Sequence, residues 1–317
     1  MKPASVIVLI IAAILVVSGI IMCLVGNSVA KKDNMELFPK VRDGVPYLKQ
    51  EFSANKISKI ELDVNNVTVN VTGGDITSSI EFINYNPNLY TLDVTSQAIS
   101  FDEIESIKSL FNIWENGFGF KGYRNLLNLN SLRAKGSKEI NVHLGDGSLI
   151  SSLVIKGKNV KINVENAQIK KEFKLIAENA EVNLLSFTAG AGISFECENL
   201  SALFDTTACG KLKIESDNTK LIARKSDLRQ IDVTTDSGSV DIGNLVREEK
   251  TEYDFSTKSG VLTVDGEKVE GFSYSVKPTE GDPEFTYRIK TASANISYSN
   301  EEPENTDQTS QPEETAA

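Results

Sequence analysis

The feature that most constrains this chain is a short motif that returns about every 20 residues. "KNVKINV" at 158–164 is followed by "ENAEVNL" from Glu178, "ENLSALF" from Glu198 and "DNTKLIA" from Asp217. Steps of 20, 20, 19, 19 and 22 residues separate the repeated turn residues, which are Asn159, Asn179, Asn199, Asn218, Ser237 and Ser259. Periods of this length are typical of supersecondary units that stack on one another.

Each repeat holds two short runs in which apolar and polar residues alternate. The first run is represented by Val160, Ile162 and Val164, and the second by Phe173, Leu175 and Ala177. Alternation with a period of two places the apolar residues on one face of a strand. One such pair of strands cannot bury its apolar face alone, so successive pairs are expected to stack around a continuous core. Phe195 and Ile214 should then lie on neighbouring coils inside the stack.

The turns and the prolines agree with this interpretation. Asparagine tolerates left-handed backbone angles and can hydrogen-bond to its stacked copies, while Ser-Gly replaces it in the last two turns. No proline occurs between Asn88 and Lys277, as expected where every strand needs its N–H groups for pairing. The predicted fold is all-β, a single-stranded β-helix-like solenoid with about 20 residues per coil, after one N-terminal transmembrane helix.

The N-terminal segment 4–26 carries no charge and has about the 20 apolar or small residues that a helix needs to cross a bilayer. We predict a transmembrane helix. A cleaved signal peptide is the alternative, because Ser28-Val29-Ala30 would suit a peptidase, although signal peptides usually have a shorter apolar core. Basic residues are more numerous after the segment than before it, which favours a cytoplasmic main domain, but long domains translocate regardless of charge.

Composition divides the chain into further segments. The expected organisation is a transmembrane helix at 4–26, a juxtamembrane linker at 27–54, a β-solenoid domain at 55–299 with an irregular or helical insertion at 101–136, and a disordered tail at 300–317. The tail has six acidic residues and no basic one, so it lacks the apolar surface that would offset the entropy of ordering. The insertion has apolar residues at helical spacing, which are expected to be core or to cover the solenoid end, with a contact to a partner or the membrane surface as the alternative.

Two strand-rich stretches resemble a known family. They are "KISKIELDVNNVTVNVTGGD" and "INVHLGDGSLISSLVIKGKNVKINV", and they occur together with turns of the form "SG-x-V" or "N-x-x-V". Over residues 55–298 the chain resembles the bacterial putative-adhesin, β-strand-repeat family of unknown function. The resemblance implies a membrane-anchored β-solenoid, usually outside the membrane, and supplies no catalytic residues.

Several kinds of chemistry are excluded by the residues present. The net charge of −11 opposes binding to nucleic acid, so no nucleic-acid partner is expected. His143 is the single histidine, which excludes His-dependent triads and multi-histidine metal sites. It alternates with Ile140, Val142 and Leu144 and is expected to point outward from a strand. No nucleotide-binding or nucleophile motif occurs, so we expect no catalytic residues, no cofactor-binding residues and no enzymatic activity.

The three cysteines are too few for a disulfide scaffold. Cys23 lies in the apolar N-terminal segment. Cys197 follows Ile193 and Phe195 in alternation and is expected to be a small buried residue of a strand. Cys209 precedes Gly210 in an expected turn, and a disulfide between Cys197 and Cys209 is the alternative.

Four carboxylates precede the repeated turns and form the one candidate ligand site. They are Glu178, Glu198, Asp217 and Asp236. Stacked about 5 Å apart, the usual strand spacing, they repel one another unless they are solvated, protonated or bridged by a cation. Two interpretations follow, a solvated acidic edge or a metal ladder that binds a divalent cation such as Ca²⁺.

Together these features predict a membrane-anchored, extracytoplasmic β-solenoid that is a non-enzymatic binding or structural module of the bacterial cell envelope. It would be a single-pass protein of the cell membrane whose partners are the membrane, through the N-terminal helix, and an envelope polymer or protein. The first alternative is a carbohydrate-active β-helix enzyme, which would need two carboxylates with separated pKa values. The second alternative is a scaffold on the cytoplasmic side of the membrane, which would polymerise end to end through the open edges of the solenoid.

Overall fold

The computed structural model describes residues 40–42, 45–53, 56–85, 90–103, 137–145, 150–243, 250–278 and 281–299. These residues are all-β, and none of them forms a helix long and apolar enough to cross a membrane. The predicted transmembrane helix at 4–26, most of the insertion at 101–136 and the acidic tail at 300–317 lie outside the described residues.

The chain divides into two compact units. The smaller comprises residues 1–49, 81–91 and 103–138, and the larger comprises residues 50–80, 92–102 and 139–317. Strands in or entering the smaller unit include β1 (Lys40–Arg42), β2 (Val45–Phe52), β5 (Ser78–Ile83) and β6 (Tyr90–Val94). β1 and β2 form an antiparallel pair in which Lys40 lies opposite Tyr47, within the segment predicted as a linker.

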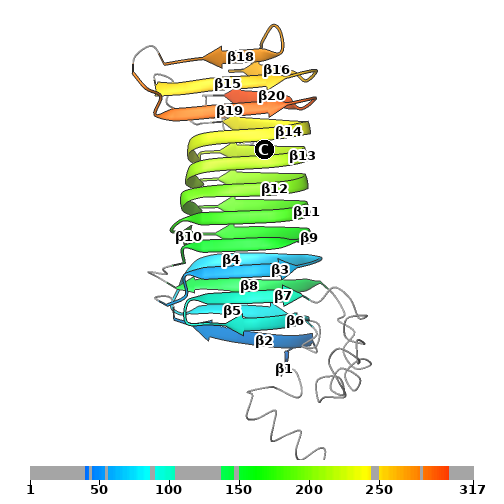
Figure 1. The fold of residues 1–317 in the computed structure, drawn as a ribbon, viewed down its shortest axis with the longest axis vertical. Coiled ribbons are helices and arrows are strands. Elements are labelled where there is room, and N and C mark those ends of the chain that lie inside the picture. Colours follow the sequence, from blue (N-terminus) through cyan, green and yellow to red (C-terminus); the bar gives the residue numbers. More distant parts are fainter. Residues whose placement is uncertain are drawn as a thin grey trace, which may run out of the picture. The chain divides into compact units, whose positions relative to one another are not determined.

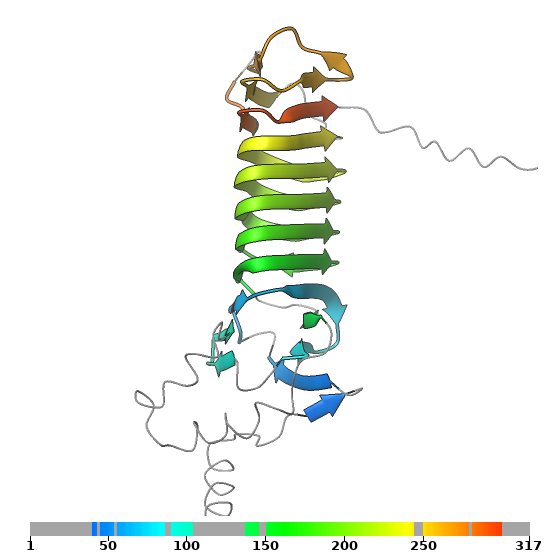
Figure 2. The same ribbon diagram turned by 90° about the vertical axis from the view of Figure 1, so that its right-hand side faces the viewer.

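The larger unit contains a stack of coils in which each coil is one long strand that bends at a corner (Figures 1 and 2). The strands are β9 (Ser152–Glu165), β11 (Glu172–Leu185), β12 (Thr188–Asp205), β13 (Ala208–Arg224) and β14 (Asp227–Gly243). Neighbouring coils pair in parallel, and the short β10 (Gln168–Ile169) also pairs with β12. The register aligns Asn159, Asn179, Asn199, Asn218 and Ser237, which confirms the predicted steps of 20, 20, 19 and 19 residues.

At the N-terminal end of the larger unit, the order of coils in space differs from their order in the sequence. β3 (Lys59–Val64) and β4 (Val67–Asp75) pair in parallel with β9. On their other side, β3 pairs with β7 (Ala98–Glu103) and β4 pairs with β8 (Lys138–Gly145). The first coil in the sequence is therefore held between two later ones.

The C-terminal end shows the same exchange of order. β19 (Phe285–Thr291) and β20 (Asn295–Ser299) stack on β14, and β15 (Thr251–Thr257) and β16 (Leu262–Val264) stack on β19 and β20 (Figure 1). β17 (Glu267–Lys268) and β18 (Ser273–Val276) then pair antiparallel with β16 and β15. Ser259 lies in the same column as Ser237, as predicted, since Thr257 and Thr235 both align with Thr291. The two are not on neighbouring coils as predicted, because the coil of Thr291 lies between them.

The apolar residues of both predicted runs lie in the core. Phe195 is aligned with Ile214 as predicted, and both side chains are fully buried. Phe195 of β12 makes edge-to-face ring contacts with Phe173 of the neighbouring coil β11 and with Phe204 of its own coil. Near the C-terminal end aromatic side chains fill the core, and the hydroxyls of Tyr253 and Tyr298 are 2.9 Å apart. This pairing explains how two polar oxygens are accommodated inside.

In the regular coils, left-handed backbone occurs mainly at a different corner from the one predicted, whereas Asn66 and Gly238 are left-handed at the predicted corner, with φ angles of 53° and 113°. The φ angles of Asn166, Ser186, Thr206 and Lys225 are 51°, 51°, 54° and 49°. The repeated asparagines Asn159, Asn179, Asn199 and Asn218 lie inside continuous strands, and none of these four has positive φ. Their predicted backbone role is therefore wrong, whereas their predicted hydrogen bonding is tested by the side-chain contacts described below.

Candidate functional site

The four predicted carboxylates lie on one corner of the coil stack. Glu178, Glu198, Asp217 and Asp236 are all exposed, and each precedes an aligned residue of the repeated turn column. Among the residues that the structure describes, no group of three or more His, Cys, Asp or Glu side chains is placed to hold a metal ion. The calcium ladder stays a prediction. All four carboxylates are exposed to water.

Next to the carboxylates runs a ladder of amide hydrogen bonds, which we call the corner ladder. Asn159 donates from Nδ2 to Oδ1 of Asn66 at 2.7 Å, Asn179 donates to Asn159 at 2.8 Å and Asn199 donates to Asn179 at 2.9 Å. Ser237 donates its hydroxyl to Asn218 at 3.4 Å. The predicted hydrogen bonding between stacked turn residues is confirmed, and it ties together the coils from β4 to β12 and joins β13 to β14.

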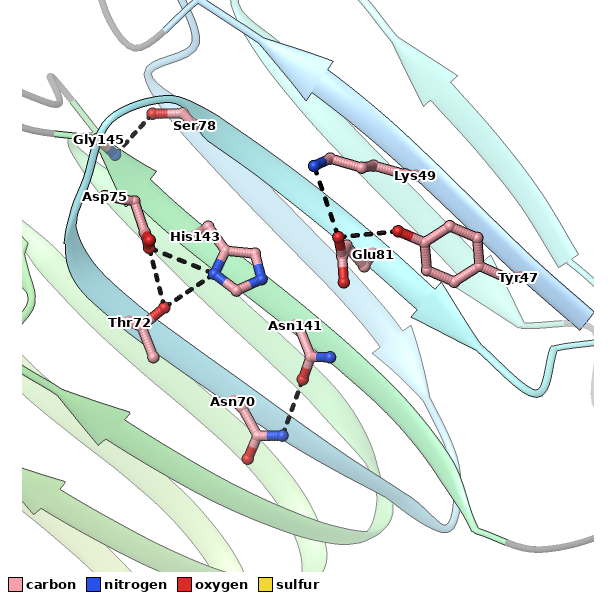
Figure 3. Close-up of polar contacts among 10 residues, drawn as sticks. All are labelled: Tyr47, Lys49, Asn70, Thr72, Asp75, Ser78, Glu81, Asn141, His143 and Gly145. Carbon is pink, nitrogen blue, oxygen red and sulfur yellow. Dashed lines mark hydrogen bonds and ion pairs between the residues drawn. The ribbon is translucent and has the colours of Figure 1, made fainter. Parts of the chain in front are cut away.

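A second ladder on a flat outer face was not predicted. Asn70 donates to Asn141 at 2.9 Å, Asn163 donates to Asn70 at 2.9 Å and Asn183 donates to Asn163 at 3.1 Å. All four side chains are half-buried, and Figure 3 shows Asn70 of β4 turned toward Asn141 of β8. We call these residues the face ladder.

The sequence does carry a signal for the face ladder. Each of its asparagines stands between two branched or aliphatic residues, in "VNV" at 69–71, "INV" at 140–142, "INV" at 162–164 and "VNL" at 182–184. Asparagine is depleted in strands, so its recurrence at the equivalent position of four strands indicates a shared structural role. The flanking residues are buried, which fixes the asparagines on the outer face.

His143 takes part in a polar cluster beside the face ladder. Its Nδ1 lies 3.0 Å from the Thr72 hydroxyl and 3.3 Å from Oδ2 of Asp75 (Figure 3). Ile140, Val142 and Leu144 are buried, so the predicted outward position of His143 is confirmed. Thr72 and Asp75 both face the same ring nitrogen, and the cluster joins β4 to β8.

Ion pairs cover much of the remaining outer surface of the larger unit. Lys161 contacts Glu181 at 2.6 Å, and Lys174 contacts Glu196 at 3.0 Å. Hydrogen bonds from Lys156 and Lys59 lower the pKa of Glu61, and the hydrogen bond from Lys161 lowers the pKa of Glu181. These carboxyls are held in the ionised form, which suits pairing between coils and opposes a role as a proton donor.

The smaller unit has its own polar contact. The Tyr47 hydroxyl donates to Oε1 of Glu81 at 2.8 Å, and Lys49 lies 3.7 Å from the same oxygen (Figure 3). Burial, followed by the hydrogen bond to Glu81, raises the pKa of Tyr47. Phe82 packs edge-to-face with Tyr85 and stacks with Tyr90. The arrangement fixes strand ends within this unit.

Both described cysteines are free and buried. Cys197 is a small buried strand residue as predicted, but Cys209 lies within β13 and the predicted turn there is wrong. The alternative disulfide is also wrong, because the two side chains occupy different positions along the coil: Cys197 aligns with Ser216, and Cys209 with Ala189 and Leu228. Burial raises the pKa of Cys197 to about 11 and that of Cys209 to about 12.

Comparison with known proteins agrees with the strand repeat. The sequence pattern of the family described as Toastrack DUF4097 matches residues 53–298, which include nearly all of the described strands. The chain belongs to the Toastrack DUF4097 family. The Toastrack DUF4097 match confirms the adhesin-type, unknown-function family predicted over residues 55–298. No curated protein matches the chain.

Two solved structures are similar to this Toastrack DUF4097 chain. One is a "putative cell adhesion protein" from Clostridium sporogenes, which is 14% identical, with 80% of this chain and 99% of that chain covered and a TM-score of 0.35. The other is a "putative adhesin" from Parabacteroides distasonis, which is 10% identical, with 80% and 96% covered and a TM-score of 0.35.

Proposed function

We propose that this chain is a membrane-anchored β-solenoid that lies outside the cytoplasm and acts as a non-enzymatic binding or structural module of the bacterial cell envelope. The coil stack from β9 to β14 is the observation that carries the proposal. Its parallel register places equivalent outer residues of successive coils side by side. Such a surface suits an extended partner better than a small substrate.

The charges on the outer surface support binding over catalysis. A glycoside-cleaving site needs one carboxyl whose pKa is raised beside one that stays ionised. Hydrogen bonds donated by lysines lower the pKa values of Glu61 and Glu181, which opposes a role as proton donor for either carboxyl. The carbohydrate-active enzyme is therefore the weaker alternative.

The end of the stack bears on the polymerising scaffold. β18 pairs antiparallel with β15, whereas every further coil would need a parallel neighbour. A short strand that breaks the pairing pattern is a common way to block edge-to-edge association. The pairing at this end therefore opposes end-to-end polymerisation of the chain. The exposed side chain of Phe272 beside β18 is an apolar group that remains uncovered there.

Membrane attachment rests on the apolar segment 4–26. The length and absence of charge suit one transmembrane helix, and the solenoid would then be held close to the bilayer as a single-pass protein. An envelope polymer or protein is the proposed partner, and the net charge of −11 argues for a neutral or cationic one. We also propose that a divalent cation such as Ca²⁺ binds along Glu178, Glu198, Asp217 and Asp236.

Extraction of cell membranes tests the anchor. The full chain should stay with the membrane pellet after washing with alkaline carbonate, because a spanning helix resists treatment that releases peripheral proteins. A variant without residues 4–26 should appear in the soluble fraction. Release of the full chain by carbonate would contradict membrane anchoring.

A further inference from the structure

An uncharged strip crosses six neighbouring coils on one outer face of the larger unit. Its members, which we call the neutral strip, are Asn141, Asn70, Asn163, Asn183, Leu203 and Ile222. With strands about 4.8 Å apart, the strip extends about 24 Å along the stack. Asp241 is the next residue in the column and ends the strip at β14.

The amides of the strip have hydrogen-bonding capacity that the face ladder does not use. A side-chain amide carries two N–H donors and an oxygen with two lone pairs. In the ladder, Asn70 and Asn163 each donate one N–H and accept one bond at oxygen. A second N–H and a second lone pair of each remain for a ligand on these two neighbouring coils, whereas Asn183 also hydrogen-bonds to Glu181.

Apolar side chains continue the strip where the amides end. Leu203 aligns with Asn183, and Leu185 lies two residues beyond Asn183 on the same face of β11. Leu185 is 45% exposed and Leu203 is 44% exposed. Amides and aliphatic groups thus form one contiguous surface, which can accept hydrogen bonds and cover C–H groups of the same ligand.

Charges of both signs lie beside the strip, including those of the exposed Glu165 and the half-buried Asp205. Glu181, two residues before Asn183, is paired with Lys161, and Arg224, two residues beyond Ile222, is paired with Asp241. A strongly charged polymer therefore finds no complementary row along the strip, and a polyanion is also repelled by the net charge of −11.

We propose that the neutral strip binds an uncharged glycan chain with N-acetyl groups, which lies along the stack axis and across the strands. A β-1,4-linked pyranose chain advances by about one sugar ring per coil, and because successive rings are turned over, its N-acetyl groups meet one side of the strip at every second coil. Its N-acetyl groups match the amide donors and acceptors, and its ring C–H faces and methyl groups match Leu185 and Leu203. This inference rests on the proposed function, because it names the chemical class of the envelope polymer.

An extended peptide fits the strip less well. Its side chains repeat on one face every 6.4 to 6.8 Å or so, which departs from the spacing of about 4.8 Å between coils. After two coils a peptide is out of step with the amides. Binding of a peptide is therefore an outcome that the experiment must separate from binding of a glycan.

The test is calorimetric titration of the full chain, purified in a mild detergent, with a hexamer of β-1,4-linked N-acetylglucosamine. We expect saturable binding, and weaker binding of the matching glucose hexamer, which lacks the acetyl groups. Asn163→Leu should raise the dissociation constant at least tenfold. Asn159→Leu is the matched control, because it removes the same two ladder bonds from the corner ladder and should change the constant less than twofold.

Leu203→Asp provides a second variant, because it places a charge in the strip at an exposed position that carries little of the fold. It should also weaken binding at least tenfold. Absence of binding to the acetylated hexamer, equal weakening by Asn163→Leu and Asn159→Leu, or preferential binding of an extended peptide would overturn the inference. Carbonate extraction does not depend on Asn163, so failure of this titration leaves the proposed membrane anchor standing.

Discussion

Phe195 of β12 lies opposite Ile214 of β13 in the parallel register, and both side chains are fully buried. The pair shows how one coil supplies the apolar surface that the next coil covers. Stability of the larger unit therefore depends on contacts between coils, and a cavity in one coil weakens its neighbours on both sides.

Phe195→Ala should lower the free energy of unfolding by about 3 to 5 kcal/mol, the usual cost of removing a buried aromatic side chain. Glu196→Gln is the control on the outer face of the same strand. It removes a partly exposed ion pair with Lys174 and should cost less than about 1 kcal/mol. Denaturant unfolding of both variants measures the difference, and equal losses would show that the inner and outer faces are assigned wrongly.

The exchanged order of the C-terminal coils can be tested by engineered disulfides. In a background without native cysteines, Ser237→Cys with Ser293→Cys should form a disulfide, because Ser293 donates its backbone N–H to Asp236 and the two coils are about 5 Å apart. Ser237→Cys with Ser259→Cys should not, since another coil separates them by about 10 Å in total. Electrophoresis without reductant detects each disulfide. The reverse result would show that the C-terminal coils stack in the order in which they occur in the sequence.

The buried cysteines predict a loss of stability at alkaline pH. Burial raises the pKa of Cys197 to about 11, whereas an unfolded thiol has a pKa of about 8.5. Below about pH 8.5 both states hold the proton, so the thiol adds no pH dependence. Above that pH only the unfolded state releases its proton, so stability falls as pH rises toward 11.

Melting temperatures between pH 7 and pH 10.5 should therefore fall more steeply in the native chain than in a variant with Cys197→Ala and Cys209→Ala. Other groups that titrate in this range are common to both proteins, so the difference in slope belongs to the two thiols. Identical slopes would contradict the burial of these side chains.

The exposed carboxylates of the corner make a prediction about salt and calcium. Changing Glu178, Glu198, Asp217 and Asp236 to Gln or Asn should raise the melting temperature at low salt, because like charges about 5 Å apart repel one another, and the gain should shrink at high salt. If the calcium ladder forms, millimolar calcium will raise the melting temperature of the native chain and not that of the quadruple variant. If calcium does not change the melting temperature of the native chain, the four carboxylates are a solvated acidic edge and not a calcium ladder.

The sequence predicted those parts of the fold that depend on local pattern. The period and the buried side of each strand follow from alternation within one coil, as Val182 and Phe195 show. Alternation says nothing about which coil lies above another, so Ser259 was assigned to the wrong neighbour. That order is decided by pairing between segments far apart in the chain, such as β14 with β19.

Residue preference was also a partial guide to the candidate site. The left-handed corner is occupied by Asn166, Ser186, Thr206 and Lys225, of which only asparagine commonly adopts that backbone, so composition did not mark it. The corner ladder was predictable because its asparagines begin each repeat. The face ladder was missed because its asparagines stand inside strands, where the apolar neighbours dominated the interpretation.

The central claim is that the coil stack lies outside the cytoplasm, and labelling of one exposed cysteine in intact cells tests it most directly. Ser201 is exposed on the outer face, whereas Cys197 and Cys209 are buried and have raised pKa values, so Ser201→Cys adds one reactive thiol to a stack whose own thiols react slowly. With Cys23 replaced by alanine in both proteins, a membrane-impermeant maleimide should label Ser201→Cys in intact cells and leave the chain without this substitution unlabelled. Labelling of Ser201→Cys only after the cells are lysed would contradict the claim.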